Sequence, residues 1–196
     1  MARSADFFSF LGLPRKLNLD MADLEQRYRA LSRQFHPDYF YNAPAAERRA
    51  SLEQSSYLND AYRALKNPVT RIEYLLQLEG VTPKSAADAA KQVPPALLEE
   101  VFALNEELDE VRELRGSGAT PDAWKPRLER ARPPIEAKRA DHERQLQELS
   151  TRWDAAVDDG AQDEERRAIL QSLRERFLER NYITNLLDGI ERELSL

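Results

Sequence analysis

Apolar side chains recur at helical spacing along most of the chain, and no segment shows the two-residue alternation typical of a strand. The first clear run consists of Leu24, Tyr28, Leu31 and Phe35. These residues predict one apolar face of a helix. Asp20 can cap the start of this helix through its carboxylate. The helix must end before Pro37, because a proline displaces the residue before it from the helical region of backbone angles.

The first eighty residues contain three more helical patterns. These are a short apolar segment over 7–11, a helix over 45–66 that Pro68 breaks, and a short helix over 69–76 that Gly80 ends. Together with the helix after Asp20, they predict a compact helical unit over residues 1–80.

The remainder of the chain predicts a second helical unit. Residues 81–95 are rich in Ala, Lys and Pro and have weak periodicity, so we expect a linker there. Three long patterns follow, over 96–115, 121–158 and 162–193. Pro133 and Pro134 interrupt the middle one, and we expect a break or kink at that point. Short turns between long helices predict an antiparallel three-helix bundle over residues 96–196. The fold class is therefore all-α.

Charge is distributed unevenly over a chain of net charge −6. Residues 1–78 carry eleven basic and nine acidic side chains, whereas residues 79–196 carry eighteen basic and twenty-six acidic ones. An acidic chain is a poor ligand for a phosphate backbone, so we expect no nucleic-acid partner. The asymmetry indicates two parts with different partners.

The composition also narrows the possible chemistry. The chain has no cysteine and two histidines, His36 and His142. It can therefore form no disulfide, thiolate nucleophile or cysteine-held cluster, and it fits a reducing cytoplasm. No apolar run approaches the ~18 residues of a membrane span, and the N-terminal residues lack the apolar region of a secretion signal. We also expect no enzymatic activity, metal site or cofactor, because phosphate-loop and nucleophile–base patterns are absent.

The tripeptide His36-Pro37-Asp38 follows the first long helix, and residues 59–68 read NDAYRALKNP. In this order, the two strings resemble the J-domain of DnaJ-type co-chaperones. The resemblance implies recognition rather than catalysis: the tripeptide docks on a DnaK-type ATPase chaperone and stimulates its ATP hydrolysis. Basic residues of the preceding helix contribute to docking, and the matching residues here are Arg27, Arg29 and Arg33. A solvated basic face is the alternative for these arginines, because cations are favourable near any helix C-terminus.

One position departs from the J-domain pattern. J-domains commonly carry Lys or Arg directly after the tripeptide, whereas this chain has Tyr39. One expected cation is therefore missing from the docking surface.

The full layout resembles the HscB family, the J-type co-chaperones of iron–sulfur cluster assembly. The supporting strings are FFSFLGL at 7–13, RYRALSRQFHPD at 27–38, RIEYLL at 71–76 and NEELDE at 105–110. HscB proteins bind the scaffold protein IscU through the C-terminal bundle, deliver it to the chaperone HscA and stimulate the HscA ATPase. Some eukaryotic relatives carry an N-terminal cysteine module for zinc, and its absence here points to a bacterial cytoplasmic form.

The helix over 96–115 has more apolar residues than one core stripe needs. Its full stripe consists of Leu97, Val101, Leu104, Leu108 and Val111. Leu98 and Phe102 lie on an adjacent stripe, and either a wide core stripe or a partner site explains them. The resemblance implies scaffold binding by the residues Leu98, Phe102, Glu106 and Phe177. For Phe177, a core aromatic is an equal alternative.

Two further positions that the resemblance matches, Glu99 and Ala103, have different chemistry in this chain. His142 shares a face with Ile135, Leu146 and Trp153, so we expect a packed structural histidine. The leading hypothesis is a co-chaperone that bridges an HscA/DnaK-type chaperone and an IscU-type scaffold. The alternative is a J-domain co-chaperone that recruits a different client to a general DnaK-type chaperone.

Overall fold

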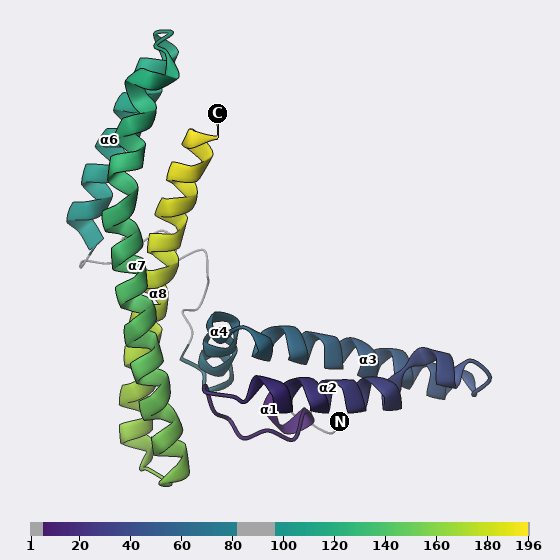
Figure 1. Ribbon diagram of the computed structural model, residues 1–196. Helices are drawn as coiled ribbons and strands as arrows, with labels where there is room; N and C mark the ends of the chain where they lie inside the picture. The colour runs from purple at the N-terminus through teal and green to yellow at the C-terminus, as the bar shows by residue number, and fades with distance from the viewer. Residues whose placement is uncertain (1–5, 82–96, 196) are drawn as a thin grey trace. The chain divides into compact units, whose positions relative to one another are not determined.

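The computed structural model describes residues 6–81 and 97–195, and in these residues all regular structure is helical (Figure 1). The elements are α1 (Phe7–Phe10), α2 (Met21–Phe35), the 3-10 helix η1 (Pro37–Phe40), α3 (Ala45–Lys66), α4 (Pro68–Leu78), α6 (Leu98–Gly116), α7 (Pro121–Asp158) and α8 (Asp163–Leu194). The predicted all-α class is confirmed.

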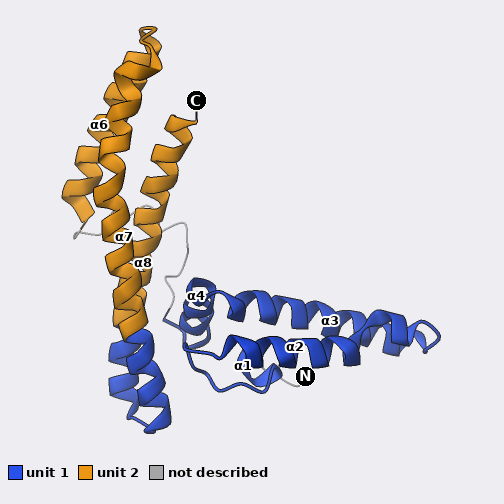
Figure 2. Cartoon of the chain, viewed as in Figure 1, with its two compact units in different colours: residues 1–82, 149–171 blue, residues 83–148, 172–196 orange. Residues whose placement is uncertain are grey.

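The chain divides into two compact units (Figure 2). Unit 1 contains Met1–Thr82 and Leu149–Gln171, and unit 2 contains Pro83–Glu148 and Ser172–Leu196. The division differs from the expected one, which placed all of residues 96–196 in a single bundle. The expected linker over 81–95 lies outside the described residues except for Val81.

Helix α3 is the centre of unit 1, because it packs against α1, α2, α4 and η1. The fully buried side chains of this core include Phe8, Leu24, Leu58, Leu65 and Leu75. Farther along the α2–α3 hairpin, the ring of Tyr28 stacks on Tyr62 with centroids 4.2 Å apart. The hydroxyl of Tyr28 also donates a hydrogen bond to Asn59 Oδ1 at 2.9 Å. Aromatic stacking of this kind adds to the stabilisation from burial and aligns the two helices.

Local capping explains where the helices of unit 1 begin. Asp20 accepts hydrogen bonds from the backbone N–H groups of Ala22 and Asp23, which confirms its predicted capping role. Asn67 caps α4 in the same way through the Val69 N–H. Gly12 has φ +68°, and a Cβ atom there would lie 2.8 Å from Arg27 Nη1. Only glycine therefore fits the turn after α1 without strain.

Residues 149–171 belong to unit 1 because the loop between α1 and α2 is hydrogen-bonded to the last turns of α7. The indole N–H of the fully buried Trp153 donates to the Arg15 carbonyl at 2.9 Å. The carboxylate of Asp154 accepts from the backbone N–H groups of Leu17 and Asn18, at 2.6 and 2.8 Å. These bonds satisfy backbone groups that would otherwise lack partners.

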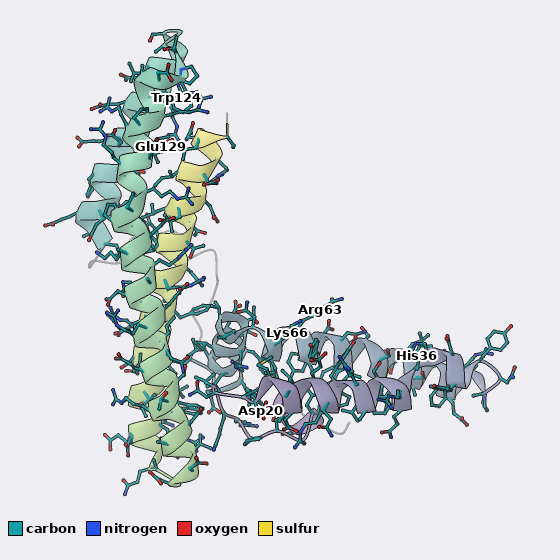
Figure 3. All side chains as sticks on the ribbon, viewed as in Figure 1. Asp20, His36, Arg63, Lys66, Trp124 and Glu129 are labelled. Carbon is teal, nitrogen blue, oxygen red and sulfur yellow. The ribbon has the colours of Figure 1, made fainter. Side chains whose placement is uncertain are left out.

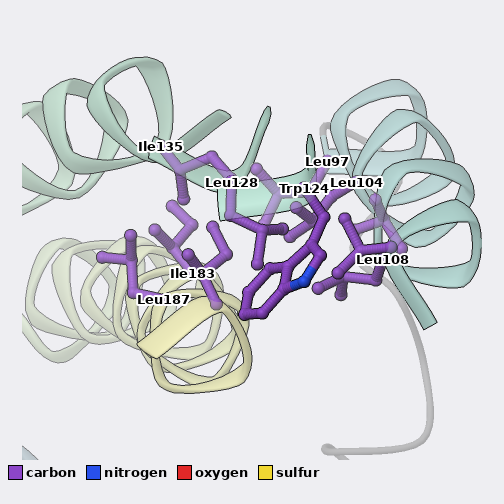
Figure 4. Close-up of a cluster of buried hydrophobic side chains, with 11 residues drawn as sticks. Leu97, Leu104, Leu108, Trp124, Leu128, Ile135, Ile183 and Leu187 are labelled. Atoms are coloured by element: carbon purple, nitrogen blue, oxygen red, sulfur yellow. The ribbon is translucent and has the colours of Figure 1, made fainter. Parts of the chain in front are cut away.

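The core of unit 2 is formed by side chains from α6, α7 and α8 (Figure 4). It contains Leu97, Val101, Leu104, Leu108, Val111, Trp124, Leu128, Ile135, Ile183, Leu187 and Ile190. All five residues of the stripe predicted on α6 are in this cluster, so their assignment to the core is confirmed.

The sequence predicts a break or kink at Pro133 and Pro134. The break is wrong, because α7 runs as one helix through Pro126, Pro133 and Pro134, and the kink stays a prediction. Each proline removes one intrahelical hydrogen bond, at a cost of about 3 kcal/mol in a helix interior. Leu128 and Ile135 are buried on either side of the proline pair. Tertiary packing therefore holds the helix together where the local preference would break it.

Candidate protein-docking sites

The tripeptide lies where α2 stops. His36 has an extended backbone, with ψ 127°, and Pro37 begins η1 directly after it. Because Pro37 disfavours a helical conformation at His36, α2 ends at Phe35 and His36 is extended. Figure 3 shows His36 at the end of the hairpin opposite to Asp20, where α2 begins. The sequence predicted this helix end but not the 3-10 turn.

Hydrogen bonds within the loop fix how His36 and Asp38 are presented. The backbone N–H of Asp38 donates to His36 Nδ1 at 3.3 Å, and the Tyr39 N–H donates to the His36 carbonyl at 3.1 Å. Because Nδ1 accepts a hydrogen bond, the proton of the neutral imidazole is assigned to Nε2. His36 and Asp38 have side chains that are 50% and 86% exposed. The loop therefore offers a partner one N–H donor and one carboxylate acceptor.

A buried serine anchors this loop from α3. The Ser51 hydroxyl donates to the Phe35 carbonyl at 2.8 Å, and Ser51 is 2% exposed. The last carbonyls of a helix have no partner within the helix, so this bond satisfies one that would be orphaned. Sequence reasoning missed Ser51, because nothing in its local pattern identifies a carbonyl sixteen residues away.

The three arginines of α2 have different roles in the structure. Arg27 pairs with Asp23 at 2.9 Å and donates to the carbonyls of Leu11 and Gly12, so it fastens α1 to α2. Arg29 pairs with Glu25 at 2.6 Å on the surface. Arg33 is exposed and forms no ion pair with the described residues. Among Arg27, Arg29 and Arg33, the guanidinium of Arg33 is therefore the most accessible to an acidic partner.

The apolar surplus of α6 lies outside the core. Leu98 is 40% exposed and Phe102 is 68% exposed, and their spacing of four residues places them on one helix face. Glu106 is exposed one turn farther along this face. The structure therefore separates these residues from the core stripe on the same helix.

Phe177 is in a different environment. It lies on α8 and is only 7% exposed, so the core alternative describes its position. Its ring is not part of the surface that Leu98 and Phe102 present. A contact between Phe177 and a partner would require a rearrangement of this side chain.

The second histidine lies in a buried polar cluster of unit 2. His142 is 4% exposed, and its Nδ1 lies 3.4 Å from Glu179 Oε2. Glu179 also pairs with Arg176 at 2.7 Å. Burial is the largest influence on the imidazole, and it lowers the pKa of His142 from the usual value. The expected packed, structural position of His142 is confirmed.

Two other kinds of site, a membrane span and a metal centre, find no support in the described residues. In residues 6–81 and 97–195, no helix has both the length and the apolar content that crossing a membrane requires. In the same residues, no three His, Asp or Glu side chains gather into a group that could hold a metal ion.

Comparison with known proteins agrees with this geometry. The family model of the DnaJ domain matches residues 6–74, which include the tripeptide and the α2–α3 hairpin. The solved chaperone HscB from Vibrio cholerae is 28% identical, with 96% of each chain covered and a TM-score of 0.56. The human co-chaperone protein HscB is 24% identical over 100% of this chain and 86% of that one, with a TM-score of 0.66.

These matches define the chain first as a J-domain protein with an additional helical region. The likeness to the HscB of Vibrio cholerae covers 96% of the chain and, together with the DnaJ domain, supports the HscB family of co-chaperones. The J-domain and this family support a DnaK-type chaperone as its partner.

Proposed function

We propose that this protein stimulates the ATPase of an HscA/DnaK-type chaperone and delivers an IscU-type iron–sulfur scaffold protein to it. The observation that carries the proposal is an exposed His36–Asp38 pair in a DnaJ domain that continues into an HscB-like helical region. The bacterial cytoplasm as its location remains a prediction from the sequence.

The chaperone step rests on the loop geometry. The backbone that carries the donor and the acceptor is held by Ser51 and Pro37, which lowers the conformational entropy lost on binding. Arg33 supplies a nearby cation that attracts an acidic surface of the chaperone. The protein itself provides no group that reacts with ATP in this proposal. It acts by favouring the conformation of the chaperone that hydrolyses ATP.

The scaffold step rests on α6. Leu98 and Phe102 form a small exposed apolar surface, and Glu99 and Glu106 add negative charge around it. Exposed apolar side chains with a polar rim are typical of protein interfaces. A scaffold with an apolar surface bordered by basic residues would complement this face.

A second candidate retains the J-domain role but changes the client. It is favoured by Glu99 and Ala103, which depart from the family pattern, and by the burial of Phe177. In that case, Leu98 and Phe102 bind a protein other than an iron–sulfur scaffold.

The test is the steady-state ATPase of an HscA-type chaperone with this protein, in the presence and absence of the scaffold. We expect stimulation by the protein and a further increase when scaffold is added. Replacing Leu98 and Phe102 with Ala should weaken scaffold binding and abolish that further increase, while stimulation without scaffold persists. Stimulation that is indifferent to scaffold would favour the second candidate. A fall of several degrees in the melting temperature of the double variant would mean that these residues support the fold.

A further inference from the structure

The exposed apolar side chains of unit 1 gather at one end of the hairpin. In the described part of this unit, four large apolar side chains are exposed. They are Met21 at 39%, Leu52 at 57%, Tyr39 at 74% and Tyr41 at 78%. All except Met21 belong to the loop that carries His36 or to the first turns of α3. Scattered apolar residues on a surface need no explanation, but a group of three beside one motif does.

An open depression lies beside the docking tripeptide. It is lined by Pro37, Asp38, Tyr41, Asn42, Arg48 and Leu52. Arg48 reaches the Tyr41 carbonyl at 3.5 Å and forms no ion pair with the described residues. The depression therefore combines two exposed apolar side chains with the cation of Arg48 and the carboxylate of Asp38.

Tyr39 extends this surface toward the histidine. Its ring lies edge-on to the imidazole of His36, with centroids 6.1 Å apart. A cation is common at this position in J-domains, so an aromatic side chain replaces a charge next to the tripeptide here. Tyrosine contributes a large contact area with few rotatable bonds, which favours it in interfaces.

The depression is continuous with the proposed docking site, because Pro37 and Asp38 belong to both. A partner that binds the Asp38 carboxylate must cover or border the depression. We propose that Tyr39, Tyr41 and Leu52 form an apolar part of the docking surface for the HscA/DnaK-type chaperone, with an apolar side chain of the chaperone in the depression and an acidic group near Arg48. This inference rests on the proposed function.

The proposal has a consequence for salt dependence. Contacts between exposed charges weaken as salt screens them, whereas apolar contacts do not. Docking through Tyr39, Tyr41 and Leu52 should therefore persist at salt concentrations that weaken docking through arginines alone. Replacing Tyr39 with Lys should make the affinity depend more steeply on salt.

The experiment measures chaperone ATPase against the concentration of the full-length protein, at low and high salt and without scaffold. The test variant combines Tyr41→Ser with Leu52→Ser, and the matched control is Gln54→Ser, an exposed position on the same helix. We expect the test variant to raise the half-maximal concentration about ten-fold, because tyrosine is enriched among the residues that dominate the binding energy of interfaces. Maximal stimulation should persist because His36 and Asp38 are intact. The variant Tyr41→Phe should behave as the wild type.

Three outcomes would overturn the inference. The test variant could match Gln54→Ser in half-maximal concentration at both salt levels. The test variant could instead lose helix content, as measured by circular dichroism. The single variants Tyr41→Ala and Leu52→Ala then replace it, and the inference fails if neither raises the half-maximal concentration in a folded protein. Analytical ultracentrifugation could show that the wild type self-associates and the test variant does not, which would assign the surface to a second copy of the chain.

Failure of the proposed function has a different signature. If the wild type and the His36→Gln variant both leave the ATPase unchanged, the chaperone role fails and this inference falls with it. If the wild type stimulates, His36→Gln does not and the test variant equals the wild type, only the apolar docking surface is rejected.

Discussion

The two histidines of this chain are in opposite environments, and the comparison shows how the surroundings assign their roles. His36 is half exposed in a short loop, where its ring and Asp38 meet solvent. His142 is almost fully buried among Glu179 and Arg176. The first side chain contributes little to packing and is free to bind a partner. The second contributes to the stability of the bundle and is inaccessible to a partner.

The largest expected effect is at His36. The substitution His36→Gln removes the imidazole N–H that the loop presents, and we expect it to abolish ATPase stimulation. Because the side chain is 50% exposed, thermal unfolding should be unchanged. The measurement is steady-state ATPase together with a thermal melt. If His36→Gln still stimulates the chaperone ATPase, the exposed imidazole of His36 is not required for docking.

The reverse pattern is expected for His142. The substitution His142→Ala leaves a cavity at a buried position, so we expect the free energy of unfolding to fall by about 2 kcal/mol. Stimulation of the chaperone should persist at temperatures where the variant is folded. Urea unfolding monitored by circular dichroism gives the comparison, with Arg144→Ala as an exposed control on the same helix. An unchanged free energy of unfolding would remove the structural role.

A smaller effect concerns pH. Burial is the largest influence on His142 and disfavours its charged imidazole, as do Arg176 and Lys138. Glu179 and Asp141 favour the charged form but are outweighed, so the pKa of His142 falls. The unfolded chain therefore binds a proton at this residue more readily than the folded protein does. The stability contributed by neutral His142 is complete above a pH of about 6.5 and declines as the pH falls below it. Urea unfolding from pH 7.5 to about 5 should show a shallower decline in His142→Gln than in the wild type. If the free energy of unfolding declines equally with falling pH in both proteins, the lowered pKa of His142 is contradicted.

The smallest effect is expected at Ser51, which links the exposed loop to the buried core. The substitution Ser51→Ala removes the hydrogen bond to the Phe35 carbonyl and should lower the free energy of unfolding by about 1 kcal/mol. The loop would be held less firmly, so a partial loss of stimulation should accompany it. The variant Ser51→Thr retains the hydroxyl and tests whether the bond matters. Full stimulation in Ser51→Ala would show that Pro37 alone positions His36.

Features set by neighbouring residues could be predicted from the sequence. Asp20 caps α2, Pro37 ends it, and the stripe from Leu97 to Val111 is buried, because each depends on the helical period or on a local hydrogen bond. The exposed position of His36 follows from the same local logic.

Features set by contacts between distant segments could not be predicted. The Ser51 hydroxyl, the Asp154 carboxylate and the Arg27 guanidinium all bind backbone groups of other elements, and a sequence does not show which carbonyl or N–H lies within reach. At Pro133 and Pro134 the local rule allowed either a break or a kink, and the break does not occur because Leu128 and Ile135 are packed in the core on either side. The sequence also left Phe177 undecided, since an apolar position on a helix face is compatible with both core and surface.

The hydrogen bonds from Trp153 and Asp154 to the loop between α1 and α2 affect whether the J-domain can be transferred to another protein during evolution. A gene fragment that encodes only the first eighty residues omits both of these side chains. The Leu17 and Asn18 N–H groups would then lose their carboxylate, and the Arg15 carbonyl would lose its indole donor. We therefore expect that this J-domain cannot be exchanged as a cassette between proteins, and that its evolution is tied to the helical hairpin over 149–171.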